Sequence, residues 1–319
     1  MKYRQLGRSA LKVSELCLGT MNFGPRPSEA ESFAILNAAV EGGINFIDTA
    51  NQYGGALGVG TTETILGKWL AEDRGRRDRI VLATKVHEPM SDDINDRGLS
   101  ARHIKMACDA SLKRLQVDHI DLYQMHHIDR LAPPEEIWQA MDRLIAQGKI
   151  TYVGSSNFPG WKIAQLNEKA GSRLGLVSEQ SLYNLIERRA EMEVIPACRE
   201  YGLGVIAWSR LAGGLLAGKA QTDGGRRQTE EMRRATAAKD EQLTRFANLC
   251  DELGLSQRSI ALGWLLPQPG VTSAIIGPGN LEQLTSVLSV PDGRLYPALL
   301  EKIDAIFPAV GPAPEAYAW

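Results

Sequence analysis

Long apolar runs, paired cysteines and a strong net charge are all missing from this chain of 319 residues. No apolar stretch approaches the roughly 20 residues that a membrane-spanning helix needs, and the N-terminus lacks the apolar core of a signal peptide. We therefore expect a cytoplasmic protein without a membrane partner. The net charge of -2 argues against a nucleic-acid or anionic-membrane binder. The four cysteines lie far apart with no Cys-x-x-Cys motif, which predicts reduced, mostly buried thiols.

Short apolar runs alternate with segments of helical period along the whole chain. Helix signals separate the runs, such as the capping box of Ser28 and Glu31 before one helix and the pair Gly42–Gly43 after it. Eight runs are typical of strands, at 13–20, 44–48, 79–85, 119–126, 151–157, 176–180, 204–209 and 273–277. This alternation implies right-handed βαβ crossovers and a parallel sheet. Eight units in about 300 residues predict an α/β fold of the (β/α)8 TIM barrel type, and a doubly wound sheet is the alternative.

Both ends of the chain extend beyond these eight units. The opening segment 1–13 has a turn at Gly7–Arg8 between short extended pieces, which predicts an N-terminal β-hairpin that caps the bottom of the barrel. The last alternating helix is predicted at 281–289, and the residues that follow it form a C-terminal extension. No internal low-complexity linker divides the chain, so we expect a single domain over residues 1–319.

The predicted strands end on polar side chains. The strand 44–48 ends on Asp48, and Tyr53 lies just beyond it, although a buried acid and phenol are costly unless they are paired. The other strand ends supply Gly19, Thr20, Lys85, His126, Ser155, Ser156, Asn157, Gln180, Trp208, Ser209 and Gly277. In a barrel these ends share one rim, where the active sites of this architecture lie.

Four of these residues could act together in a proton transfer, with Tyr53 as the group that gives or takes the proton. Tyrosine, with an ordinary pKa of about 10, is a poor acid at neutral pH, but a nearby ammonium lowers that pKa. Lys85 could supply the ammonium, with Asp48 holding it charged and in place. His126 could hydrogen-bond the same oxygen. Tyr53 would then give a proton to a carbonyl oxygen, or take one in the reverse reaction.

The hydride for such a reaction must come from a cofactor. Ser156, Asn157 and Gln180 have the side chains to hold a carboxamide. Trp208 offers a flat face for a nicotinamide ring. The glycines of segment 54–60 do not match the dinucleotide-binding fingerprint and do not follow a strand directly, so a Rossmann domain is not expected.

At this point the chain resembles the aldo-keto reductases over nearly its whole length, through LCLGTMNFG, NFIDTANQYG, IVLATK, DHIDLYQMH, GKITYVGSSNF, SEQSLYN, WSRLAGGLL and IIGPGNLEQL. The resemblance implies a catalytic tetrad of Tyr53, Lys85, Asp48 and His126, with Tyr53 as the general acid and base. It also implies NADP(H) or NAD(H) bound extended across the rim. The implied cofactor-binding residues are Gly19, Thr20, Met21, Asp48, Ser156, Asn157, Gln180, Trp208, Ser209, Arg210, Leu211, Gly213, Lys219, Arg227, Gly277, Gly279 and Gln283.

The chain departs from the family pattern at the adenosine end of the cofactor. Gly279 stands where many members place an arginine for the 2′-phosphate, and Ser286–Val287 replace a frequent Glu-Asn pair. Arg210, where relatives commonly have proline, could replace the missing charge, as could Arg226 or Arg227. We expect NADPH as the cofactor, and NADH stays open.

The predicted function is the NAD(P)H-dependent reduction of an aldehyde or ketone to an alcohol, or the reverse. The chain looks most like bacterial members that include deoxysugar ketoreductases, so a sugar ketone, a polycyclic ketone and a small aldehyde all stay open as substrates. The direction of the reaction, and whether the protein is a monomer or a homo-oligomer, are not predicted.

Two other functions compete with this reading. The first is a cofactor-binding regulatory module with little turnover, like the β subunits of potassium channels, which carry asparagine where this chain has His126. The second is a metal-dependent hydrolase. His126 and His127 are expected to face opposite sides of a strand, and no carboxylate cluster accompanies them, so no catalytic metal is predicted.

Overall fold

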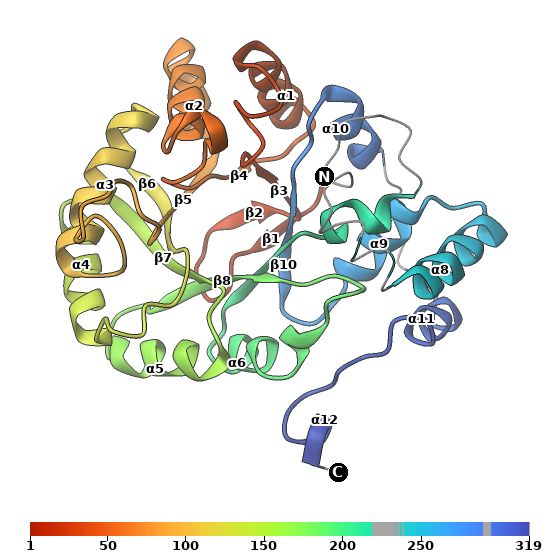
Figure 1. The fold of residues 1–319 in the computed structure, drawn as a ribbon. Coiled ribbons are helices and arrows are strands. Elements are labelled where there is room, and N and C mark those ends of the chain that lie inside the picture. The colour runs from red at the N-terminus through yellow and green to blue at the C-terminus, as the bar shows by residue number, and fades with distance from the viewer. Residues whose placement is uncertain (219–233, 235–236, 238, 290–294, 319) are drawn as a thin grey trace.

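A computed structural model gives the architecture of the protein and describes residues 1–218, 234, 237, 239–289 and 295–318 (Figure 1). Eight parallel strands close into a barrel in the order β10-β3-β4-β5-β6-β7-β8-β9. The closure is made by β3 and β10, where Leu16 lies opposite Ala274. The TIM barrel prediction is confirmed, and the doubly wound alternative is wrong because such a sheet has two free edges.

The barrel strands occupy almost the positions that the apolar runs predict. They are β3 Leu16–Gly19, β4 Phe46–Asp48, β5 Val81–Val86, β6 Ile120–Met125, β7 Ile150–Ser156, β8 Leu176–Leu182, β9 Gly204–Trp208 and β10 Val271–Ile276. The main difference is at the first run, 13–20, which is two strands. Its beginning belongs to the hairpin strand β2 (Lys12–Ser14), and only its end enters the barrel as β3.

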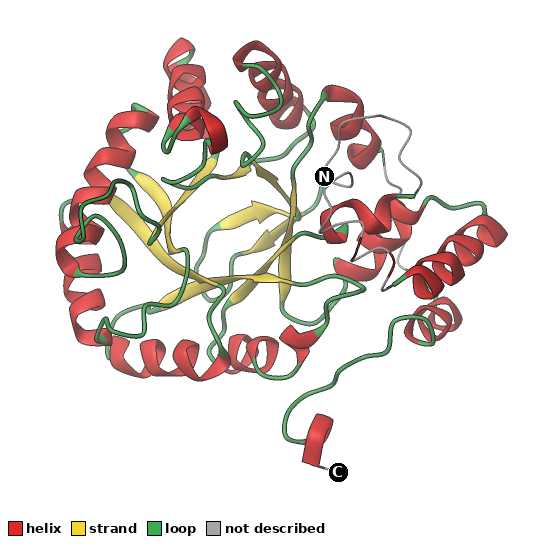
Figure 2. Ribbon diagram, viewed as in Figure 1, coloured by secondary structure: helices red, strands yellow, loops and turns green. Residues whose placement is uncertain are grey.

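The helices form a ring around the strands, as Figure 2 shows. They are α1 Glu29–Glu41, α2 Thr61–Glu72, α3 Ala101–Leu115, α4 Pro134–Ala146, α5 Gly160–Ala170, α6 Val194–Glu200, α8 Asp240–Leu253, α9 Gln257–Leu265 and α10 Leu281–Leu288. The predicted capping box at Ser28 and Glu31 is formed at the start of α1. The C-terminal extension adds α11 (Pro297–Asp304) and α12 (Glu315–Ala318) outside the ring. The main core fills the layer between strands and helices.

The N-terminal hairpin closes one end of the barrel, as predicted. Strand β1 (Tyr3–Gln5) pairs with β2 in an antiparallel sheet. Leu6 and Val13 are fully buried in a second apolar cluster with side chains of the barrel interior, namely Cys17, Phe46, Val81, Ala83, Leu122, Val177 and Ile206. This plug lies at the N-terminal ends of the strands, so only the opposite rim is left for a functional site.

The cysteines agree with the prediction from their spacing. Cys17, Cys108, Cys198 and Cys250 are all buried free thiols. Within the residues that the structure describes, no helix is both long enough and apolar enough to cross a membrane.

Candidate active site

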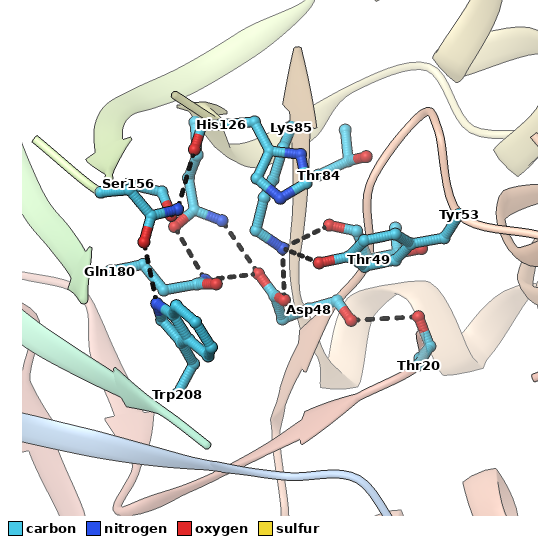
Figure 3. A network of polar contacts seen from close by, with 12 residues as sticks. Thr20, Asp48, Thr49, Tyr53, Thr84, Lys85, His126, Ser156, Gln180 and Trp208 are labelled. Carbon is cyan, nitrogen blue, oxygen red and sulfur yellow. Dashed lines mark hydrogen bonds and ion pairs between the residues drawn. The ribbon is translucent and has the colours of Figure 1, made fainter. Parts of the chain in front are cut away.

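A buried ion pair joins two strand ends at the C-terminal rim (Figure 3). The ammonium of Lys85, on β5, lies 2.5 Å from Oδ2 of Asp48, the last residue of β4. The same ammonium donates a hydrogen bond to the Thr49 carbonyl at 2.8 Å. Both charged side chains are almost completely buried. Burial alone lowers the pKa of Lys85, but Asp48 and the Tyr53 hydroxyl raise it above its ordinary value, so the lysine is charged at neutral pH.

Two glutamines hold the other carboxylate oxygen of Asp48. Gln124 on β6 and Gln180 on β8 each donate to Oδ1 at 2.9 Å, and Gln180 also donates to the side-chain Oε1 of Gln124 at 3.3 Å. Gln124 was not among the predicted site residues. A signal for it existed, because Gln124 is a polar residue near the C-terminal end of the predicted strand 119–126.

Tyr53 reaches the ion pair from the loop between β4 and α2. Its hydroxyl lies 3.4 Å from the Lys85 ammonium, and that ammonium lies 5.0 Å from the centroid of the tyrosine ring. The loop is anchored at both sides, since the Tyr53 N–H donates to the Ala50 carbonyl and the Thr62 N–H donates to the Tyr53 carbonyl. The phenol oxygen is therefore positioned beside a positive charge that is fixed by Asp48.

His126 completes the group of four predicted residues. Its ring lies edge-to-face with that of Tyr53, with centroids 5.7 Å apart. Burial, together with the nearby Lys85 charge, lowers the pKa of His126 to about 2, so the imidazole is neutral. Within the described residues its Nδ1 atom has no hydrogen-bond partner. The ring is held instead by packing.

The prediction that the side chains of His126 and His127 face opposite sides of a strand is wrong. The two rings are stacked at a centroid distance of 4.9 Å and an interplanar angle of 12°. The physical reason is that β6 ends at Met125, so the alternation of a strand no longer applies to the two histidines. His127 in turn pairs with Glu88 at 3.3 Å. Among the described residues, no group of three or more histidine, cysteine, aspartate or glutamate side chains could hold a metal ion.

The ends of β7 and β9 are joined by Asn157. Its amide donates to the His126 carbonyl at 3.1 Å and to the Ser156 hydroxyl at 3.0 Å, and its oxygen accepts from the Trp208 indole at 3.0 Å. Asn157 has a positive φ of 58°, a conformation that asparagine tolerates better than most residues. Trp208 is half-buried, and its orientation is fixed by this contact.

A loop rich in left-handed backbone follows Trp208. Ser209, Ala212, Gly213 and Gly214 all have positive φ, and Ser209 is bonded through its carbonyl to Asn184 and through its hydroxyl to the Gly213 N–H. Strain of this kind in residues other than glycine collects at functional sites. Leu211 is half-buried in the same loop. Asn184 was not assigned a role from the sequence.

Several other predicted cofactor residues lie at or just after the ends of β3 and β10. Thr20 donates to the Asp48 carbonyl at 3.0 Å. Gly19 packs so tightly against β10 that a Cβ atom there would lie 2.5 Å from the Ile275 side chain. Met21 is exposed at this rim, and the next residue, Asn22, donates to the Gly277 carbonyl. The Gly279 N–H donates to Gln283 at the start of α10. Lys219, Arg226 and Arg227 lie outside the described residues.

These rim residues fit a nicotinamide dinucleotide in chemistry. Arg210, directly after Ser209, is a buried cation, and the described residues provide it with no hydrogen bond or ion pair. The loop that follows it carries Gly213 and Gly214, and residues without a Cβ atom allow the backbone to approach a phosphate closely. The half-buried indole of Trp208 supplies an aromatic face near the four polar residues.

The fold and this group of side chains define a barrel oxidoreductase, and comparison with known proteins gives its family. Residues 15–307 match the sequence profile of the Aldo/keto reductase family, and the chain belongs to this family. The resemblance inferred from the sequence motifs is confirmed. Enzymes of this family act on small-molecule carbonyl compounds and generally use NAD(P)H.

Three relatives illustrate the range of the family. "Uncharacterized oxidoreductase YrpG" from Bacillus subtilis is 49% identical, covering 100% of both chains. "Probable voltage-gated potassium channel subunit beta" from Arabidopsis thaliana is 34% identical, covering 99% of this chain and 100% of its own. "Norsolorinic acid reductase B" from Dothistroma septosporum is 33% identical, covering 97% of this chain and 82% of its own.

Proposed function

We propose that the protein is an NADP(H)-dependent aldo-keto reductase that reduces an aldehyde or ketone to an alcohol, with Tyr53 as the general acid. The observation that carries this proposal is the position of the Lys85 ammonium between the Asp48 carboxylate and the Tyr53 hydroxyl. A buried cation at this distance stabilises negative charge on the phenol oxygen, so the proton of Tyr53 is easier to transfer.

The chain's own residues divide the work of proton transfer. Asp48 keeps Lys85 charged. Gln124 and Gln180 keep Asp48 in place by donating hydrogen bonds to its second carboxylate oxygen, Oδ1. When bound, the nicotinamide cofactor supplies the hydride. Tyr53 gives its proton to the carbonyl oxygen, which becomes a hydroxyl. In the reverse direction the same oxygen of Tyr53 accepts the proton.

His126 orients the carbonyl in this proposal. It is neutral, so it can donate one N–H hydrogen bond without bringing a second positive charge beside Lys85. Its ring is fixed between Tyr53 and His127 by ring contacts, and its backbone is fixed by Asn157. A donor held in this way costs little reorganisation when negative charge develops on the oxygen.

Residues Ser156, Asn157 and Gln180 stay our candidates for holding the carboxamide. Trp208 is the candidate for stacking on the nicotinamide ring. The substrate stays open among a sugar ketone, a polycyclic ketone and a small aldehyde, since specificity in this fold is set by the rim loops.

The change Tyr53→Phe tests the proposal. It removes the acidic proton but keeps the aromatic ring over Lys85. We expect kcat for carbonyl reduction to fall by at least ~100-fold, while the Kd for the cofactor, measured by quenching of tryptophan fluorescence, stays unchanged. Tyr296→Phe is the matched control, because Tyr296 is exposed at the start of α11. Full activity in Tyr53→Phe would exclude Tyr53 as the general acid.

A regulatory module that binds the cofactor with little turnover is the second candidate. The similarity to a protein named as a potassium channel subunit supports it. His126 argues for turnover, because a neutral imidazole beside the acid has a use in catalysis. The second candidate would be favoured if purified wild-type protein binds NADPH but reduces no aldehyde, ketone or sugar carbonyl. The Tyr53→Phe variant would then show the same binding and the same lack of turnover.

A further inference from the structure

Arg210 is a buried cation without an anion. It lies two residues after Trp208, the last residue of β9, and it is only 7% exposed. Burial of a guanidinium is costly unless a carboxylate or another acceptor offsets the lost water. In the described part of the chain neither is in contact with Arg210, in contrast to buried Arg188, which is bonded to Glu191 and Asp304.

A second arginine lies close to the first. Arg258 is in the first turn of α9, which carries no acidic residue, and it donates to the Ser286 hydroxyl on α10 at 3.2 Å. The start of α9 lies against the loop that follows Arg210, because Gln257 accepts a hydrogen bond from the Gly218 N–H at 3.1 Å. Burial, and then the Arg258 charge, lower the pKa of Arg210 to about 10. The Arg258 charge therefore disfavours the charged form of Arg210 in the absence of an anion.

The ligand that suits two neighbouring guanidinium groups is a phosphate. Arginine matches phosphate geometry with paired hydrogen bonds, and charge-assisted bonds of this kind are about twice as strong as neutral ones. The start of α9 adds the positive end of a helix, with no acidic side chain in its first turn to neutralise it.

The two arginines differ in how far they are buried below the protein surface. Arg210 is two residues from Trp208, the proposed partner of the nicotinamide ring, and it is buried. Arg258 is only half-buried and lies farther out, bonded to α10. A dinucleotide has its pyrophosphate in the middle and, in NADP(H) alone, a further phosphate on the adenosine ribose.

We infer that Arg210 binds the pyrophosphate and that Arg258, supported by Ser286, binds the adenosine 2′-phosphate, so that Arg258 selects NADP(H) over NAD(H). This assignment rests on the proposed use of a nicotinamide cofactor, but not on turnover. Arg258 takes the selecting role that was predicted for Arg210, Arg226 or Arg227.

Calorimetric binding of four ligands tests the assignment: NADP+, NAD+, adenosine 2′,5′-bisphosphate and adenosine 5′-monophosphate. We expect Arg258→Gln to weaken NADP+ and the bisphosphate by ~10-fold or more. NAD+ and the monophosphate should change by no more than about twofold. Arg258→Lys, which keeps the charge, should restore part of the affinity for NADP+. The control is Arg245→Gln, an exposed arginine on α8 that donates to the Ala305 carbonyl.

The variant Arg210→Lys separates the two roles. Replacing the planar fork with a point charge should weaken NADP+ and NAD+ by the same factor, because both contain a pyrophosphate. Thermal melting of each variant checks that it is folded before binding is measured. An Arg258→Gln protein that loses affinity for NADP+ and NAD+ equally, or for neither, would overturn the inference.

The outcomes also separate this inference from the proposed function. A wild-type protein that binds NAD+ as tightly as NADP+ removes the selecting role of Arg258 and leaves the reductase proposal intact. A protein with Arg258-dependent binding of the bisphosphate but full activity in Tyr53→Phe removes the proposed role of Tyr53 and leaves the phosphate site intact.

Discussion

His126 is a histidine that the folded protein keeps uncharged over an unusually wide range of pH. Its pKa is lowered to about 2, chiefly by burial, whereas an unfolded chain has histidine at about 6.5. Below pH 6.5 the unfolded state therefore binds a proton that the folded state does not. The free energy of unfolding must fall as the pH falls from 6.5 toward the folded pKa.

The change His126→Gln should remove this dependence. Between pH 7 and pH 5 we expect the wild-type protein to lose about 2 kcal/mol more unfolding free energy than the variant. Urea unfolding at the two pH values measures the difference. The control is His119→Gln, because His119 has a side chain that is 45% exposed. A variant with the same pH dependence as the wild type would show that His126 is protonated in the folded protein near neutral pH.

Much of the candidate site could be predicted because parallel strands of a barrel end on one rim. Asp48, Lys85 and His126 are far apart in sequence, yet this single rule places them together. The contact between His126 and His127 could not be predicted in the same way, since it depends on β6 ending at Met125. The bonds of Gln180 and Asn157 to their neighbours also depend on side-chain directions, which a sequence pattern does not determine.

Helix α2 links the barrel to the Tyr53 loop and packs very closely against α3. The contact is at Gly67, where a Cβ atom would lie 2.1 Å from the Arg114 carbonyl oxygen and 2.8 Å from the Leu115 carbonyl carbon. No side chain fits between the two backbones at this point. The first turn of α2 also holds the carbonyl of Tyr53 through the Thr62 N–H.

We expect Gly67→Ala to destabilise the protein although alanine favours helices. The gain in helix propensity is about 1 kcal/mol, whereas forcing apart two packed backbones costs about 1–3 kcal/mol or more. Urea unfolding should therefore give a net loss of stability. Gly75→Ala is the control, because its Cβ atom would meet only the Asp73 side chain at 3.2 Å. Equal stability of Gly67→Ala and the wild type would mean that α2 can shift away from α3 without cost.

The positions of the secondary structure elements were predictable wherever an apolar period and a capping signal coincide, as at α1. The run 13–20 was not divided correctly, because both of its halves are apolar and extended. What separates β2 from β3 is their pairing, one with β1 and the other with β4 and β10. Partners of this kind are set by the tertiary structure.

The two ends of the barrel have different roles: one end contributes to stability, and the other carries the candidate site. The hairpin seals one end of the barrel, and the candidate site occupies the other. Gly7, in the hairpin turn, has a φ of 55°, and a Cβ atom there would lie 2.2 Å from the Val177 carbonyl oxygen. The turn therefore rests directly on the backbone of the barrel.

We expect Gly7→Ala to lower the melting temperature while kcat, measured well below that temperature, stays close to the wild-type value. The matched control is Gly254→Ala. Gly254 has a φ of 62° in the left-handed region and open space around it, so the control carries the backbone strain alone. The strain is about 1–2 kcal/mol, and the close approach should add a further ~1–3 kcal/mol in Gly7→Ala. A large loss of kcat in Gly7→Ala, with its stability unchanged, would contradict this separation.

The pairing of β3 with β10 also sets an order of events during synthesis. Leu16 and Ala274 are neighbours in the barrel, although roughly 260 residues separate them along the chain. At about 5–20 residues per second, a ribosome needs roughly 13–50 s to make the partner of the first barrel strand. Until then β3 has an unpaired edge, and strands in that state are prone to aggregate. Strand β4 covers only the opposite edge of β3, so the edge that later pairs with β10 stays open for most of the time that the nascent chain spends on the ribosome.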